Sequence, residues 1–289
     1  MTLVKQPEAK LMNLFFITNS VPLAQFAVDN GADRIFVDLE VLGKNERQGH
    51  LDTLISRHSV NDVAAVRAVV PAGRLLVRIN PINEHTVDEV EQVIEAGADI
   101  IMLPMFRTPR EVELFVAAVN GRARTTLLVE TVGAMESLHE CVSVRGVNEV
   151  HIGLNDLHLE LRRRFMFELL ADGTVDRMAQ VLNDALIPFG IGGVARVGEG
   201  LLPAELILAE HARLGSSAAI LSRTFHRRAE TVADIRAQMD FGAQVAKLRQ
   251  AYEHHMSASQ EDLLRAHRKV AAIVTSIASS IAAQGLVSN

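Results

Sequence analysis

The stretch Thr125-Thr-Leu-Leu-Val-Glu130 is a short apolar run that ends in a carboxylate, and Val150-His-Ile-Gly-Leu-Asn-Asp156 repeats that pattern. Both runs are typical of buried β-strands. Glu130 and Asp156 are 26 positions apart, about one strand–helix unit, so the two strands are expected to be adjacent and parallel. Neighbouring strands lie roughly 4.8 Å apart, and carboxylates at matching strand ends can therefore share one cation. Because both ligands are oxygens, Mg²⁺ or Mn²⁺ is favoured over zinc.

Apolar runs of this kind alternate with helical patterns along the chain. The strand-like runs are Leu14–Asn19, Arg34–Glu40, Leu75–Asn80, Ile100–Met105, Thr126–Thr131, Val150–Asn155, Phe189–Val194 and Ala219–Phe225. Amphipathic stretches such as Val87–Ala96, Pro109–Val119 and Pro203–Leu214 lie between them. Eight strand–helix units over about 225 residues predict an α/β protein with a (β/α)₈ TIM barrel. A doubly wound open sheet is the alternative, but the turn Thr18-Asn-Ser-Val-Pro22 after the first run lacks the glycines of its phosphate loop.

Polar side chains gather at the ends of the second and third runs. Because successive side chains of a strand point to opposite faces, Asp38 and Glu40 share one face of the second strand. By the same rule, Arg78 and Asn80 share one face of the third strand. Barrel enzymes build their active sites at the carboxyl ends of their strands, so these residues are candidates for an active site.

The same counting orients the fifth and sixth runs. Glu130 shares a face with Leu128, and Asp156 shares a face with Leu154. His151 then points to the opposite side, towards the helical layer, and is expected to have a structural role.

The last part of the chain differs in character from the rest. We expect a barrel domain over residues 1–228 and a helical extension over residues 229–289. The extension contains the helical stretches Ala229–Tyr252 and Ser259–Ala283. The second stretch carries an apolar stripe through Leu264, Val270, Ile273, Ile277 and Ile281. A barrel needs one helix after its last strand, so the stripe of the surplus helix must be buried on its own barrel or on a partner subunit. We favour the partner, and hence a homo-oligomer built through the C-terminal helices.

Composition excludes several classes of function. A formal charge of −6 and a pI near 6.0 give no electrostatic reason to bind nucleic acid. The single cysteine, Cys141, rules out an intramolecular disulfide and suits a reducing compartment. No apolar run reaches the roughly 18 residues that cross a bilayer, and the polar start does not resemble a signal peptide. These features predict a cytoplasmic protein that binds no membrane.

Five motifs occur in barrel order. They are Val37-Asp-Leu-Glu40, Val77-Arg-Ile-Asn80, Gly97-Ala-Asp-Ile-Ile-Met-Leu-Pro104, Leu128-Val-Glu-Thr131 and Ile152-Gly-Leu-Asn-Asp-Leu157. The set resembles the family that joins class II pyruvate aldolases (hydroxy-oxo-acid aldolases) with the citrate lyase β-subunit and the malyl-CoA lyases. The likeness covers roughly residues 13–226.

The resemblance implies roles for individual residues. Glu130 and Asp156 match the two carboxylates that hold Mg²⁺ or Mn²⁺ in this family. Arg78 matches the arginine that binds the keto-acid end of the substrate. Glu40 matches an acidic residue of the site, with Asp38 close by.

The sixth run matches a substrate-binding segment, since the backbone amides around Gly153, Leu154 and Asn155 match those that meet the substrate carboxylate. The chain departs from the family after Glu40. Val41 stands where the CoA-lyase branch usually has an aspartate and the pyruvate-aldolase branch has a histidine.

The chemistry of the candidate residues points to carbon–carbon bond cleavage. Breaking a bond next to a ketone leaves a pyruvate-type enolate, which a divalent cation chelated by a 2-oxo acid stabilises. The guanidinium of Arg78 adds positive charge beside the enolate oxygen. A base must take the hydroxyl proton, and either Glu40, through a water, or His50 in the following loop can serve. The sequence predicts a metal-dependent aldolase that acts on a small 2-oxo or hydroxy acid.

Two other functions stay open. A citryl- or malyl-CoA-type thioester lyase needs a basic surface for the phosphates of CoA, and Arg162-Arg-Arg164 offers one. A metabolite-binding or regulatory barrel that has lost catalysis would account for Val41. Retention of the two carboxylates and of Arg78 argues against lost catalysis, because a binding protein has less need of charge stabilisation.

Overall fold

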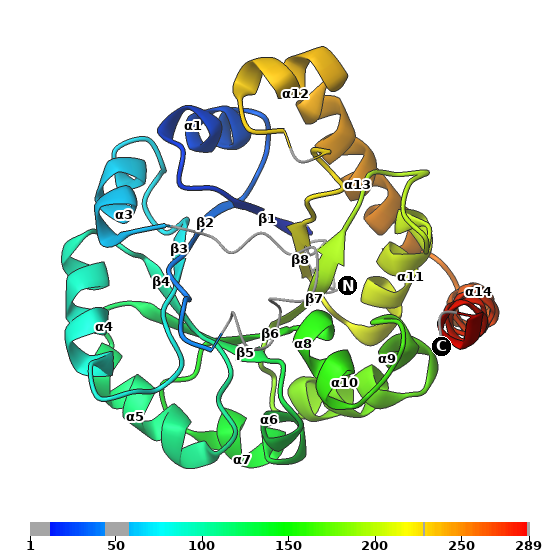
Figure 1. Cartoon of the computed structure of the whole chain (residues 1–289), viewed down its shortest axis with the longest axis horizontal. Coiled ribbons are helices and arrows are strands. Elements are labelled where there is room, and N and C mark those ends of the chain that lie inside the picture. Colours follow the sequence, from blue (N-terminus) through cyan, green and yellow to red (C-terminus); the bar gives the residue numbers. More distant parts are fainter. Residues whose placement is uncertain (1–11, 44–57, 228, 288–289) are drawn as a thin grey trace, which may run out of the picture.

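Eight parallel strands close into a barrel in sequence order, β1 to β8. A computed structural model describes residues 12–43, 58–227 and 229–287; His50, a candidate base, lies outside them. Figure 1 shows the strands as an inner ring with helices around it. The strands are β1 (Asn13–Ile17), β2 (Arg34–Asp38), β3 (Leu75–Arg78), β4 (Ile100–Leu103), β5 (Arg124–Val129), β6 (Glu149–Ile152), β7 (Phe189–Val194) and β8 (Ala218–Leu221). The predicted (β/α)₈ barrel is confirmed.

Helices follow each strand of the barrel. They are α1 (Val21–Asp29), α3 (Val60–Arg67), α4 (Thr86–Glu95), α5 (Pro109–Val119), α6 (Val132–Glu136), α7 (Leu138–Ser143), α8 (Leu154–Glu160), α9 (Glu168–Ala171), α10 (Thr174–Asp184), α11 (Ala204–Leu214), α12 (Val232–Gln238), α13 (Phe241–Met256) and α14 (Gln260–Val287). Local sequence sets several helix starts. In α5, for example, the Thr108 side chain accepts from the amide of Glu111, and the Glu111 carboxylate accepts from the amide of Thr108.

Side chains inside the barrel form their own apolar cluster, separate from the larger core between strands and helices. The inner cluster consists of Phe15, Phe36, Leu76, Ile100, Met102 and Leu128. These side chains fill the middle of the barrel, as they do in other eight-stranded TIM barrels. This apolar layer separates the polar groups at the amino-terminal end of the barrel from those at its carboxyl end.

Several strands are shorter than the apolar runs indicate, and the predicted end of the sixth strand is wrong. β6 ends at Ile152, Gly153 is the N-cap of α8, and Asp156 lies in the first turn of that helix. Period-two alternation therefore does not extend to Asp156, and counting back from it gives the wrong face for His151. His151 pairs in register with Leu128 and lies 5.8 Å from Phe15, measured between ring centroids, so it points into the barrel.

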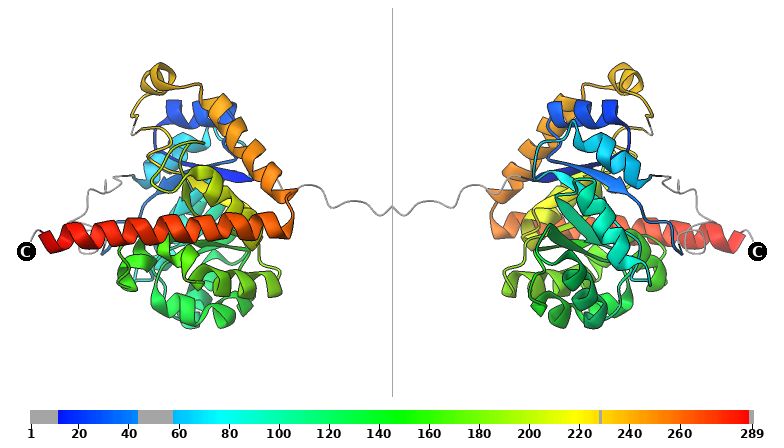
Figure 2. Two further views of the ribbon diagram at one scale, coloured as in Figure 1. Left: turned by 90° about the vertical axis from the view of Figure 1, so that its right-hand side faces the viewer. Right: turned by 90° about the vertical axis from the view of Figure 1, so that its left-hand side faces the viewer.

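The chain after β8 forms three helices, where the sequence predicts two. The predicted helix Ala229–Tyr252 is interrupted before α13, because the Asp240 side chain accepts from the amide of Ala243 and caps a new helix. The long helix α14 packs against α9 and α11 and extends past the side of the barrel (Figure 2). In the described part of the chain, no helix combines the length and apolar character that a membrane crossing needs.

The apolar stripe of α14 is covered mainly by the barrel of its own chain. Val270 is buried, and Ile273 and Ile277 are partly buried against the core of the barrel. Leu264 and Ile281, at the two ends of the stripe, are 47% and 37% exposed. The expectation that a partner subunit buries the whole stripe is therefore wrong. Only the two ends of the stripe are exposed to a neighbouring chain.

Candidate active site at the carboxyl ends of the strands

Arg78 is clamped by two acids at the ends of β2 and β3. Asp38 and Arg78 are partners in the strand register. The Arg78 Nε donates to Oδ1 of Asp38 at 2.8 Å, and its Nη2 donates to Oδ2 at 2.9 Å. The same Nη2 lies 3.2 Å from Oε2 of Glu40. Both carboxylates are almost fully buried, so this pairing holds the guanidinium in one orientation.

The clamp also keeps Arg78 charged. Burial by itself lowers the pKa of Arg78, but the negative charges of Asp38 and Glu40 outweigh it and raise the pKa above the ordinary arginine value. Glu130 contributes in the same direction. The carboxylate predicted as a metal ligand therefore lies within electrostatic reach of the predicted substrate-binding arginine, as the sequence pattern indicates.

Asn80 and His58 hold the end of β2 and the loop that follows it. The amides of Val41 and Leu42 donate to Oδ1 of Asn80 at 2.9 and 3.0 Å, and Nδ2 of Asn80 donates to Glu89 at 2.8 Å. Nδ1 of His58 accepts from the amide of Asp38 at 3.0 Å. Asn80 was visible in the sequence as a polar strand end, whereas nothing in the sequence indicates that His58 reaches back twenty positions to Asp38.

Glu130 follows β5 directly and is held from the neighbouring loop. Its Oε1 accepts a hydrogen bond from the amide of Met105 at 3.2 Å. Met105 has a left-handed backbone with φ 54°, a conformation that is costly for a side chain of this kind and is common at functional sites. This backbone donor is a part of the site that side-chain patterns in the sequence do not reveal.

The start of α8 lies directly against Glu130. β5 and β6 are parallel neighbours, as predicted, with Val129 opposite Ile152. A Cβ atom added at Gly153 would lie 2.9 Å from Cβ and 3.1 Å from Oε2 of Glu130. Only glycine fits there. The approach brings the Glu130 carboxylate to the segment that carries Asp156 in its first helical turn.

Glu130 and Asp156 suit a hard divalent cation. Both offer carboxylate oxygens, and Oε2 of Glu130 faces the start of α8. Within residues 12–43, 58–227 and 229–287, no cluster of three or more His, Cys, Asp or Glu side chains could hold a metal ion. Two carboxylates alone would suit Mg²⁺ or Mn²⁺, which take other ligands from water and substrate, and would not suit a structural zinc ion.

The backbone predicted to meet a substrate carboxylate is partly in use. The amide of Gly153 donates to the carbonyl of Val129 at 2.9 Å, which continues the β5–β6 ladder into α8. Leu154 and Asn155 are the first two residues of the helix, and amides in that position have no acceptor within the helix. Among the described residues, only the Gly153 amide of the three has an acceptor, so the amides of Leu154 and Asn155 can donate to a ligand.

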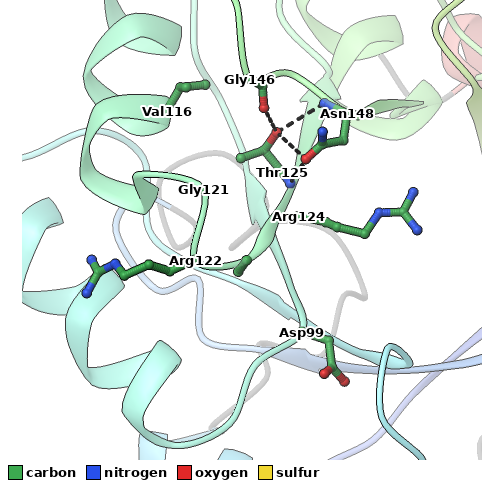
Figure 3. A pocket seen from close by; sticks show the side chains of 9 residues that line it. Asp99, Val116, Gly121, Arg122, Arg124, Thr125, Gly146 and Asn148 are labelled. Carbon is green, nitrogen blue, oxygen red and sulfur yellow. Dashed lines mark hydrogen bonds between the residues drawn. The ribbon is translucent and has the colours of Figure 1, made fainter.

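A surface pocket of about 410 Å³ lies at the other end of the barrel (Figure 3). It is lined by residues that precede or begin β4, β5 and β6, among them Asp99, Arg124 and Asn148. Asn148 Oδ1 accepts from the amide of Thr125 at 2.8 Å, and Arg124 pairs with Glu149. Arg122 and Arg124 point in opposite directions (Figure 3). The pocket offers no convergent set of reactive groups.

The barrel and its rim of acids around one arginine define a class: a TIM-barrel protein with an enzyme-like site at the carboxyl ends of β2, β3, β5 and β6. A model of the HpcH/HpaI aldolase/citrate lyase family matches residues 11–166, more than half of the chain. The chain belongs to this family. No curated protein sequence matches it.

Solved structures share the fold at low sequence identity. An HpcH/HpaI aldolase from Desulfitobacterium hafniense aligns with a TM-score of 0.56 and 13% identity, over 90% of this chain and 98% of that one. A family protein from Burkholderia cenocepacia aligns with 0.60 and 15%, over 80% and 96%. The protein CitE from Mycobacterium tuberculosis, crystallised with magnesium and acetate, aligns with 0.56 and 15%, over 90% and 96%.

Proposed function

We propose that this chain is a metal-dependent carbon–carbon lyase, an aldolase that acts on a small 2-oxo or hydroxy acid. The observation that carries the proposal is the placement of Arg78, clamped by Asp38 and Glu40, within electrostatic reach of Glu130. The magnesium in the structure of the related CitE protein supports the choice of cofactor.

Each candidate residue has a separate role in this proposal. Glu130 and Asp156 would hold Mg²⁺ or Mn²⁺, which when bound supplies Lewis-acid stabilisation of a pyruvate-type enolate. Arg78 uses Nε and Nη2 for its two acids, and Nη1 has no hydrogen-bond partner among the described residues. Nη1 is therefore the edge that donates to the keto-acid end of the substrate. The amides of Leu154 and Asn155 would bind the substrate carboxylate.

Cleavage requires a proton to leave the substrate hydroxyl. In a 4-hydroxy-2-oxo acid, the bond between C3 and C4 breaks, its electron pair enters the enolate, and the C4 hydroxyl becomes an aldehyde. Glu40 is placed 3.2 Å from Arg78 and would accept the hydroxyl proton through a water molecule, then return it to C3 to give pyruvate. His50 is the alternative base.

Mn²⁺-dependent cleavage of 4-hydroxy-2-oxo acids, followed as pyruvate release, tests the proposal. We expect activity in the wild type and a loss of about 10³-fold in Glu130→Gln, since the substitution removes a charge at the cation. Oxalate binding by calorimetry accompanies each assay. If both proteins bind oxalate and neither releases pyruvate from any substrate, a binding or regulatory role replaces the enzyme.

A CoA-thioester lyase is the second candidate, supported by Arg162 and Arg164. Both are exposed, and the described residues give neither side chain an ion pair, whereas Arg163 pairs with Asp172 at 2.7 Å. Cleavage of malyl-CoA or citryl-CoA in preference to free hydroxy acids would favour this candidate. Its loss in Arg162→Ser with Arg164→Ser would place the CoA phosphates on these side chains.

We also propose a homo-oligomer in which the ends of α14 contact a second copy. Among the side chains of α14 up to residue 283, Leu264 and Ile281 are the large apolar ones that are exposed, and such side chains are frequent at subunit contacts. Light scattering should give a multiple of 31.6 kDa for the wild type and a smaller particle for Leu264→Glu. A monomeric wild type would overturn this part.

A further inference from the structure

His151 is buried in the middle of the barrel and uses one ring nitrogen. Its Nε2 lies 3.0 Å from the carbonyl oxygen of Gly192 on the next strand. A carbonyl only accepts, so Nε2 carries the hydrogen and donates it. The side chain is 1% exposed, and burial lowers the pKa of His151 to about 4. The ring is therefore neutral at physiological pH, with one defined tautomer.

The carbonyl that His151 binds belongs to an irregular part of β7. The register between β7 and β8 shifts between Gly190 and Gly193, which marks a bulge. Gly192 lies within that bulge and has a left-handed backbone with φ 46°. Glycine adopts this conformation without strain, so the position of the Gly192 carbonyl depends on the contacts around it. The hydrogen bond from His151 is one of those contacts.

The bulge in turn supports the start of α8. A Cβ atom added at Gly192 would lie 3.1 Å from Cδ1 and 3.3 Å from Cγ of Leu154, so the Leu154 side chain packs on this backbone. Leu154 is the first residue of α8 and is 2% exposed. Asp156 is two residues further along the same helical turn. A shift of the Gly192 backbone therefore moves the segment that carries Asp156.

We propose that His151 is a positioning residue for the Glu130–Asp156 pair, acting through the Gly192 carbonyl and the Leu154 side chain. The inference rests on the proposed function, because it assigns to Asp156 a role in holding the divalent cation. Sites of this kind require their ligands to be held within about 0.5 Å of the working geometry. His151 contacts neither Glu130 nor Asp156, and it sets the position of Asp156 from inside the barrel.

Two amide substitutions separate the hydrogen bond from the imidazole itself. His151→Gln places an N–H donor near the position of Nε2, while His151→Asn is one carbon shorter and does not reach Gly192. The matched control is His211→Gln. His211 is also 1% exposed and lies within electrostatic reach of His151, but its Nδ1 bonds to Oγ of Ser216 at 2.8 Å and it has no hydrogen bond to Gly192. Each variant is measured as the full chain.

Two readouts are used besides activity: Mn²⁺ affinity from the free-ion paramagnetic resonance signal, and hydrogen exchange of residues 152–160 without metal. We expect His151→Asn to weaken Mn²⁺ binding about 10-fold, as loss of an outer-shell contact typically does, and to speed exchange in that segment. His151→Gln should stay within about 3-fold of the wild type. His211→Gln should change neither readout, even where it lowers the melting temperature.

Wild-type exchange and Mn²⁺ affinity in His151→Asn would overturn the inference. So would equal effects in His211→Gln, because they would trace the change to general stability. If the wild type itself binds no Mn²⁺, the proposed function fails, and the exchange of residues 152–160 still decides whether His151 positions that segment.

Discussion

At its amino-terminal end the barrel holds Arg34 against Glu149, and at its carboxyl end it holds Arg78 against Asp38 and Glu40. In the first cluster, Glu149 accepts from both terminal nitrogens of Arg34, from Nη2 of Arg124 at 3.0 Å and from Thr126 at 2.7 Å. Burial by itself raises the pKa of Glu149, but these partners, Arg34 above all, hold it below its ordinary value. Both oxygens of the Glu149 carboxylate therefore accept hydrogen bonds.

The second cluster leaves one nitrogen for a ligand. Nη1 of Arg78 has no hydrogen-bond partner among the described residues. The inner apolar side chains, with Phe36 and Leu128 among them, separate the two clusters. The two arginine–carboxylate clusters therefore differ in role. A cluster whose hydrogen-bonding groups are all paired stabilises the fold, whereas one with an unpaired donor can bind substrate.

The largest difference is expected between Arg78→Lys and Arg34→Lys. A lysine lacks the planar fork that each arginine uses for two-point binding. Arg78→Lys should lower kcat/KM about 10²- to 10³-fold and cost about as much unfolding free energy as Arg34→Lys, because both lysines leave buried carboxylates less well paired. Arg34→Lys should leave kcat/KM unchanged and lower the unfolding free energy by roughly 1–3 kcal/mol. Equal kinetic losses in the two variants, measured as pyruvate release, would remove the distinction between the two ends.

Glu149→Gln probes the saturated cluster through pH. Removing one partner of a buried pair leaves Arg34 uncompensated, and we expect a cost of about 3 kcal/mol at pH 7. Because the pKa of Glu149 is lowered by folding, its stabilisation is present above the ordinary value of 4.5 and is lost as the pH falls through the folded-state pKa. Urea unfolding from pH 7 to 3.5 should show the gap between wild type and variant closing at low pH. A constant gap would contradict the assignment.

Gly153→Ala tests the close approach at the carboxyl end. The new Cβ would lie 2.9 Å from Cβ of Glu130, so one of the two segments must move. We expect Mn²⁺ affinity to fall about 10-fold, which corresponds to the lower end of the cost of overpacking. Gly242→Ala, where the nearest atom is 3.3 Å away in the Asn30 side chain, serves as the control. An unchanged Mn²⁺ affinity in Gly153→Ala would show that Glu130 does not bind the cation.

Thr126→Val gives the smallest expected change. It removes the 2.7 Å hydrogen bond from Thr126 to Glu149 while keeping the shape of the side chain. The arginines still satisfy the carboxylate, so we expect a loss of about 1 kcal/mol in unfolding free energy and full activity. Chemical denaturation measures the first and pyruvate release the second; a large kinetic loss would mean that the amino-terminal cluster communicates with the site.

Much of the fold could be predicted because it depends on local patterns. The strand Phe189–Val194 has the bounds expected for it, since Pro188 marks its start and the apolar run sets its length. The helix Pro109–Val119 is also as expected, because Thr108 and Glu111 form a capping box that a sequence displays openly. Both features involve residues within a few positions of each other.

The site could be predicted only where it follows the same local rules. The facing of Asp38 and Arg78 follows from strand alternation and is confirmed by their pairing. Alternation failed for His151, because β6 stops at Ile152 and helical geometry begins before Asp156. The partnership of Arg34 with Glu149 joins residues 115 positions apart, and no local pattern encodes which polar groups meet across a closed sheet.

Anomalous diffraction from a crystal soaked with Mn²⁺ and oxalate tests the central claim most directly. The account expects one manganese peak at the carboxyl ends of β5 and β6, bound by carboxylate oxygens of Glu130 and Asp156 at about 2.0–2.2 Å, with oxalate between the ion and Nη1 of Arg78. No peak there, or a peak held by other residues, would contradict it.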